Sequence, residues 1–156
     1  MDNTDKYIYD LFKRFGIFSH DQLTIGHMSM IFDIKTHYWD EVSSIAIYKD
    51  RYKMFINENL NRSRQWQEFG HEMKHYFLDE GDILYLPKIY KIYQESKADY
   101  FAYHFCIPTF MLQKLKGVTV YDVMNLFNVE FEFALRRLEM YKNKVFERMM
   151  ACERSY

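Results

Sequence analysis

The sequence contains little cysteine, no long apolar stretch and almost no net charge, and each of these absences removes a class of protein. Only Cys106 and Cys152 occur among the 156 residues, and they form no CxxC pair. Their spacing argues against a disulfide framework and against a cysteine-rich zinc knuckle. We therefore expect the chain to work in a reducing compartment.

Membrane and nucleic-acid partners are not expected from the remaining absences. The sequence has no run of about 18 apolar residues, which a membrane-spanning helix would need. Its first residues, Met-Asp-Asn-Thr-Asp-Lys, lack the basic and apolar segments of a secretion signal. We predict a cytoplasmic protein. The formal net charge is −1, so no overall positive field attracts DNA or RNA.

The apolar residues that are present recur with helical or strand-like periods. Helical spacing predicts helices over residues 6–15, 23–32, 61–78, 87–106, 108–117 and 130–151. Two runs rich in Ile, Tyr, Phe and Met, Ser44–Tyr48 and Tyr52–Asn57, flank a polar triplet and predict a β-hairpin, and residues 33–38 predict a short extended piece. With 49% hydrophobic residues, the chain can bury the core of one domain.

One pentapeptide points to a specific chemistry. His71-Glu72-Met73-Lys74-His75 is an H-E-x-x-H sequence inside a predicted helix. Side chains four positions apart lie on the same face of a helix, so both imidazoles can reach a single ion. Imidazole nitrogen suits Zn²⁺, and the glutamate between the two histidines lies beside the metal, where it can accept a proton from water. We predict His71 and His75 as zinc ligands and Glu72 as the general base.

A catalytic zinc site needs a third protein ligand. The extended pattern that places a third histidine six residues after His75 is absent, because that position is Gly81. Twenty residues after His75 comes Glu95, and Asp99 follows one helical turn later, on a predicted stripe of small and apolar residues. Two acids embedded in such a stripe are costly to bury without a cation or a donor. This favours Glu95 as the third ligand and Asp99 as the acceptor that orients an imidazole.

Simpler interpretations of the same polar residues remain open. Glu95 and Asp99 have helical spacing that also allows ion pairs with Lys91 or Lys97. The other polar residues with ligand chemistry lack partner spacing or are more typical of packing: His20, His27, His37, Tyr100 and His104.

These segments resemble the ImmA/IrrE-type metallopeptidases, zincins that use a glutamate as third zinc ligand. The resemblance covers most of the chain. It includes the strand that ends at residues 56–58, the helix with FGHEMKHYFL at 69–78, and ESKADYFA at 95–102, which leads to Ile107-Pro108. It implies that His71, His75 and Glu95 bind Zn²⁺ and that Glu72 is the base.

The resemblance also implies a biological role. Members of this group cleave a helix-turn-helix repressor of a phage or mobile element and so derepress genes. The implied activity is therefore a zinc-dependent endopeptidase with a protein substrate. Lys74 departs from the family pattern, which usually has glycine at this position, and we expect its long cationic side chain to alter local packing or substrate access.

The expected architecture is an α+β, predominantly helical, zincin-like domain with a small antiparallel sheet beside the helix that carries the motif. Residues 1–107 are expected to form the metallopeptidase core, and residues 108–156 a C-terminal helical lobe packed on the same domain. The hairpin would either offer an edge strand to an extended substrate segment or serve a purely structural purpose.

Two functions without catalysis compete with this prediction. Residues 121–127 and 130–141 could form two helices joined by a short turn, as in a DNA-binding module, with positive charge from Arg136, Arg137, Lys142, Lys144 and Arg148. Interspersed glutamates dilute that charge. Alternatively, zinc could stabilise a protein that binds a regulator without cutting it.

Overall fold

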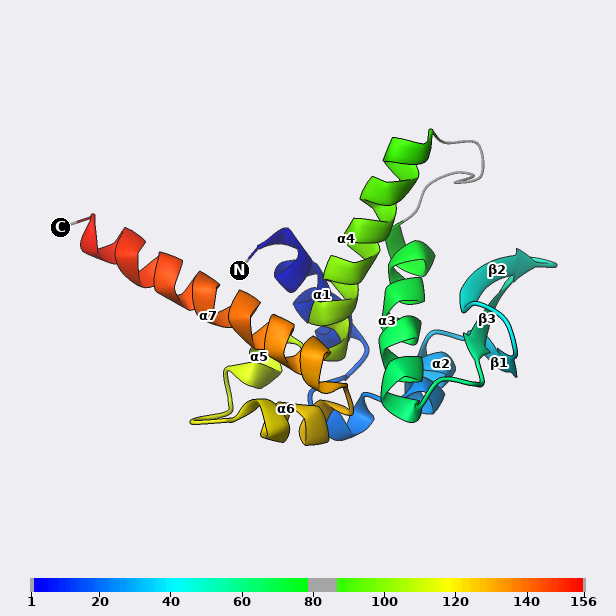
Figure 1. Cartoon of the computed structure of the whole chain (residues 1–156), viewed down its shortest axis with the longest axis horizontal. Helices are drawn as coiled ribbons and strands as arrows, with labels where there is room; N and C mark the ends of the chain where they lie inside the picture. Colours follow the sequence, from blue (N-terminus) through cyan, green and yellow to red (C-terminus); the bar gives the residue numbers. More distant parts are fainter. Residues whose placement is uncertain (1, 79–86, 156) are drawn as a thin grey trace.

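The computed structural model describes residues 2–78 and 87–155 and shows a mostly helical molecule with one small sheet (Figure 1). The helices are α1 (Asn3–Arg14), the 3-10 turn η1 (His20–Gln22), α2 (Ile25–Ile31), α3 (Arg62–Leu78), α4 (Lys88–Cys106), α5 (Thr109–Leu112), α6 (Val120–Phe127) and α7 (Phe131–Glu153). The strands are β1 (Lys35–Trp39), β2 (Ser44–Tyr48) and β3 (Arg51–Asn57). The predicted α+β, mostly helical fold is confirmed.

The element boundaries differ from the predictions at a few places. The helix predicted over 23–32 begins later, because Thr24 caps α2 by accepting a hydrogen bond from the backbone N–H of His27 at 3.1 Å. The helix predicted over 108–117 ends already at Leu112. The predicted end of α3 at residues 79–82 lies outside the described residues. Among the helices that the structure describes, none has the length and hydrophobicity needed to cross a membrane.

The sheet is mixed rather than wholly antiparallel. Its strand order is β1-β3-β2, with β2 antiparallel to β3 and β1 parallel to β3. The predicted antiparallel hairpin is therefore confirmed, but an antiparallel arrangement of the whole sheet was wrong. Residues 40–43 carry the chain past the end of β3, so that β3 lies between the other two strands. As a result, β2 is an edge strand.

Helices α3 and α4 form the centre of the molecule. They run antiparallel beside each other, the sheet lies against α3 on one side, and α1 packs against α4 (Figure 1). Apolar residues from all parts of the described chain form a single buried cluster that extends from Ile8 in α1 to Leu138 in α7. Within this cluster α3 contributes Trp66, Phe69 and Met73, each at most 2% exposed. Burial of this apolar face positions the opposite face of α3 toward solvent.

A charged cluster inside the molecule joins the N-terminus to the C-terminal helices. The side chains of Asp5, His104 and Arg137 are each 1% exposed. The ammonium group of Lys144 contacts Asp2 and donates to a carboxylate oxygen of Asp5 at 3.0 Å. Two carboxylates thus face two cations, so the buried charges are paired.

This cluster also includes a group whose geometry could suit a metal. Donor atoms of Asp2, Asp5 and His104 lie within 4.8 Å of one another. The ammonium of Lys144 already contacts both carboxylates. The group is therefore neutralised within the protein, and we interpret it as a structural ion-pair network.

We predict that His104 makes the protein less stable in mild acid. The pKa of His104 is lowered to about 4, chiefly by burial and secondly by the positive charge of Arg137, with a smaller contribution from Lys144. A hydrogen bond to the Tyr100 carbonyl and the charge of Asp5 raise this pKa but do not outweigh burial. The unfolded chain protonates this histidine near pH 6.5. Below that pH the unfolded state binds the extra proton, so the free energy of unfolding should fall by up to roughly 3 kcal/mol as pH decreases from about 6.5 to about 4.

The measurement is urea unfolding of wild type and His104→Phe across this pH range. Other groups, including any bound metal, affect both proteins alike, so the difference between the two pH slopes reports on His104. The slope should be smaller in the variant. Equal slopes would show that His104 is not held neutral in the folded state.

Candidate metal centre

Helix α3 presents the H-E-x-x-H residues on the face opposite its apolar stripe. Phe69 and Met73 are fully buried, whereas His71 and His75 are only partly covered, with side chains 18% and 12% exposed. The two imidazole rings lie 5.4 Å apart between centroids, as expected for side chains one turn apart. Glu72, between them, is 9% exposed. The helix thus directs both imidazoles into the same space.

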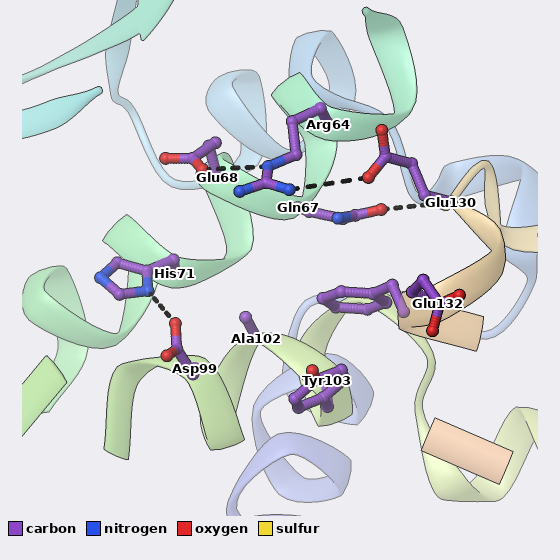
Figure 2. A pocket seen from close by; sticks show the side chains of 10 residues that line it. Arg64, Gln67, Glu68, His71, Asp99, Ala102, Tyr103, Glu130 and Glu132 are labelled. Carbon is purple, nitrogen blue, oxygen red and sulfur yellow. Dashed lines mark hydrogen bonds and ion pairs between the residues drawn. The ribbon is translucent and has the colours of Figure 1, made fainter. Parts of the chain in front are cut away.

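Helix α4 brings two acids to the same place. One carboxylate oxygen of Glu95 lies 2.9 Å from Nε2 of His71, and the other lies 3.3 Å from Nε2 of His75. Nδ1 of His71 lies 2.8 Å from a carboxylate oxygen of Asp99, the contact drawn in Figure 2. The structure therefore brings together four of the five residues that the sequence singled out, and the fifth, Glu72, lies between the two histidines on α3.

The acids are not buried, contrary to the expectation from the sequence. The side chains of Glu95 and Asp99 are 54% and 67% exposed. Their neighbours on the stripe, Ala98 and Ala102, are at most 3% exposed. The stripe is divided because only its small residues face α3, while the acids lie at the rim. The expectation that the two acids are embedded in the stripe was therefore wrong, but their contacts with His71 and His75 do not depend on burial.

The donor set fits a divalent cation of zinc type. The donor atoms of His71, His75 and Glu95 lie within 4.8 Å of one another. Tetrahedral zinc with bonds of about 2.0–2.1 Å separates neighbouring ligand atoms by roughly 3.3 Å. The distances of 2.9 and 3.3 Å between Glu95 and the imidazoles are close to that value. Two imidazoles and one carboxylate leave one position of a tetrahedron for water or substrate.

Glu72 has the environment of a proton acceptor. Burial raises the pKa of its carboxyl group to about 7; the charge of His71 lowers the pKa, that of Glu95 raises it, and a hydrogen bond to the Ile45 backbone lowers it. A base with a pKa near neutrality can accept a proton and release it again. For His71, burial lowers the pKa, but the hydrogen bond to Asp99 and the charges of Glu72 and Glu95 outweigh it, so the pKa is raised.

A cavity of about 490 Å³ adjoins these residues. Its lining combines the motif helix, α4 and the start of the edge strand β2: Val42, Ser43, Ser44, Ile45, Glu68, His71, Glu72, His75, Glu95 and Asp99. The sequence had not singled out Glu68 or the residues before β2. A signal for Glu68 was available, because it lies one helical turn before His71 and Glu72. Val42 and Ser43 carried no such signal, since only the tertiary structure places them beside α3.

Lys74 lies away from this cavity. It is 4% exposed, and its ammonium group donates to the side-chain oxygen of Gln94 in α4 at 2.6 Å. It borders a different hollow, formed with Thr4 of α1 and Tyr93 of α4. Its long side chain therefore contributes to packing between helices, the first of the two effects expected from the sequence.

The remaining candidates lie outside the centre. His20, His27 and His37 belong to none of the metal-competent groups among the described residues. Tyr100 and His104 belong to the buried ion-pair network, since Tyr100 donates to Asp2 at 2.5 Å and His104 lies 3.5 Å from Asp5.

Comparisons with known proteins identify the family of the chain. Residues 29–139 match the family described as the IrrE N-terminal-like domain. Two Bacillus subtilis (strain 168) proteins are similar over most of the chain. The phage-like element PBSX protein XkdA is 30% identical over 92% of this chain and 75% of its own length. The uncharacterized protein YqaB is 28% identical over 94% of this chain and 88% of its own length.

A solved structure supports the fold. A Mycobacterium tuberculosis transcriptional regulator superposes with a TM-score of 0.64 at 16% identity. The match covers 88% of this chain, which spans 47% of the mycobacterial chain. At this identity the likeness concerns the fold alone.

We predict that Gly70, next to the motif, is required for close packing of α3 on α4. A Cβ atom at this position would lie 2.7 Å from the sulfur of Cys106 and 3.6 Å from the backbone of Ala102. Gly70→Ala should therefore lower the free energy of unfolding by roughly 1–3 kcal/mol. The matched control is Gly26→Ala in α2, where a Cβ meets nothing within 4 Å. Urea unfolding should show no loss for the control, and equal stability of the two variants would contradict the packing argument.

Proposed function

The chain belongs to the IrrE N-terminal-like family of metallopeptidases, and on this basis we propose that it is a zinc-dependent endopeptidase. The observation that carries the proposal is the convergence of donor atoms from His71, His75 and Glu95, with Glu72 lining the same cavity. The family implies a divalent metal, and two imidazoles with one carboxylate favour Zn²⁺. In this proposal residues 108–156 form a helical lobe packed on the metallopeptidase core.

Each residue then has a separate chemical task. Bound Zn²⁺ supplies Lewis acidity, which lowers the pKa of water and polarises the scissile carbonyl. Glu72 accepts the proton of the attacking water and passes it to the leaving amine. Asp99 accepts a hydrogen bond from Nδ1 of His71, so that Nε2 of that ring, which lies 2.9 Å from Glu95, can serve as the metal ligand.

The edge strand β2 is an argument for a protein substrate. Strand β2 has no neighbour on its outer side among the described strands, and Ser44 and Ile45 line the cavity with His71 and His75. An extended segment can pair with such an edge through backbone hydrogen bonds. We propose that the substrate is a helix-turn-helix repressor of a phage or mobile element. The relative XkdA is named as a protein of a phage-like element, which supports this context.

The structure weakens the DNA-binding alternative. Of the basic residues predicted for the second helix, Arg137 is 0% exposed and donates to the Ile107 carbonyl at 3.0 Å. Lys144 is engaged by Asp2 and Asp5. Two of the cations expected to contact phosphate therefore serve the internal ion-pair network.

The first test measures the zinc content and the cleavage activity of wild type and two variants. Wild type and Glu72→Gln should each bind about one zinc per chain, because Glu72 is not a ligand, whereas Glu95→Ala should lose most of the metal. Elemental analysis of protein purified without chelator measures this. Cleavage of a co-expressed repressor should be lost in both variants. A Glu72→Gln protein that still acts on its regulator would support the binding function without catalysis.

The second test concerns Asp99. Asp99→Asn should weaken zinc binding by about 10- to 100-fold, because it removes the charged acceptor that orients His71. Competition with a fluorescent zinc chelator gives the affinity. Asp21→Asn is a suitable control, since Asp21 forms an ion pair with His20 outside the centre. Unchanged affinity in Asp99→Asn would remove Asp99 from the metal centre and leave the ligand set in place.

A further inference from the structure

A second cavity, of about 290 Å³, adjoins the 490 Å³ cavity beside the metal centre and extends toward the start of α7. The two cavities share Glu68, His71 and Asp99, so they adjoin at the metal centre and together form a groove. Beyond these residues the second cavity is lined by Arg64, Gln67, Ala102, Tyr103, Glu130, Glu132 and Phe133. The second cavity therefore lies next to the one that the start of β2 lines.

The walls of this cavity carry excess negative charge. Arg64 lies between two carboxylates, 3.3 Å from Glu68 and 3.7 Å from Glu130, as Figure 2 shows. It balances only one of them. Asp99 faces His71. Glu132, in the first turn of α7, makes no ion pair with any residue that the structure describes. Arg64 pairs with Glu68 and Glu130, and Asp99 pairs with His71, so Glu132 is the carboxylate of this lining that has no ion pair among the described residues, which favours a cationic side chain beside it.

The floor of the cavity is apolar and aromatic. The rings of Tyr103 and Phe133 lie 4.4 Å apart between centroids with an interplanar angle of 33°, and Ala102 lies beside them. Aromatic faces attract a guanidinium or ammonium group, and they also pack against the methylene stem of a long side chain. An arginine or lysine side chain satisfies both features of the cavity, whereas an acidic side chain would meet like charge.

We propose that this cavity is a specificity subsite for an arginine or lysine side chain of the protein substrate, with Glu132 as its principal charged contact. The subsite rests on the proposed peptidase function, because it selects which segment of a substrate enters the groove. Glu132 acts here as a specificity residue, since it lies beyond the metal centre and does not contact the reacting atoms.

The test uses zinc-loaded protein and fluorescent decapeptide libraries. In each library one position is fixed as arginine, norleucine or glutamate, and the other positions are randomised. At one position wild type should cleave the arginine library about threefold to fivefold faster than the norleucine library, and the glutamate library most slowly. Glu132→Gln should remove most of this preference, and Glu132→Lys should reverse it.

The matched control is Glu139→Gln. Glu139 lies two turns further along α7, is half exposed and pairs with Arg136 outside the cavity. This variant changes net charge by the same amount and should keep the arginine preference. Equal cleavage of all libraries, or equal behaviour of Glu132→Gln and Glu139→Gln, would overturn the subsite while leaving the peptidase function intact.

A binding measurement separates failure of the subsite from failure of the peptidase function. Fluorescence anisotropy with zinc-loaded Glu72→Gln protein reports affinity for the same libraries without cleavage. Tighter binding of the arginine library, lost when Glu132→Gln is added, would support the subsite. If wild type cuts none of the libraries, the peptidase function is contradicted, but this binding result would still support the subsite. Binding that does not distinguish arginine from norleucine would overturn the subsite.

Discussion

The close approach of α3 and α4 sets the position of every donor atom in the candidate metal centre. Gly70 leaves room for the backbone of Ala102 and the sulfur of Cys106, and the two helices can therefore pack without a gap between them. His71 and His75 come from one helix, and Glu95 comes from the other. A shift of one helix by about 1 Å would move the carboxylate out of range of both imidazoles, since metal–ligand distances tolerate only a few tenths of an ångström.

The buried ion-pair network holds α4 at its C-terminal end, away from Glu95 and Asp99. Arg137 in α7 binds the carbonyl that follows α4, and Asp5 in α1 faces both Arg137 and His104 of α4. Breaking one member of such a network leaves an uncompensated buried charge, which is strongly destabilising. The network thus fixes α4 to α1 and α7, so a polar cluster remote from the metal centre restrains the helix that supplies Glu95 and Asp99.

The groove that leads away from the centre combines elements distant in sequence. Strand β2 lies on one side of the motif helix, and the start of α7 lies on the other. The helix α3 contributes to both cavities through Glu68 and His71, so one helix face joins the candidate metal centre to the proposed specificity subsite. Substrate selection and catalysis would then depend on the same packing, and changes at the α3–α4 contact would affect both.

The sequence by itself determined the helices, the hairpin and the motif, because these depend on local periodicity and on side chains one turn apart in the same helix. It also indicated Glu95 and Asp99, although by an argument from burial that the structure contradicts. The parallel pairing of β1 with β3, the inward positions of Arg137 and Lys144, and the joining of β2 and α7 along one groove were decided only by the tertiary structure. Each of these depends on contacts between residues far apart in the chain, and no local pattern records which distant segment fills the space beside a helix face.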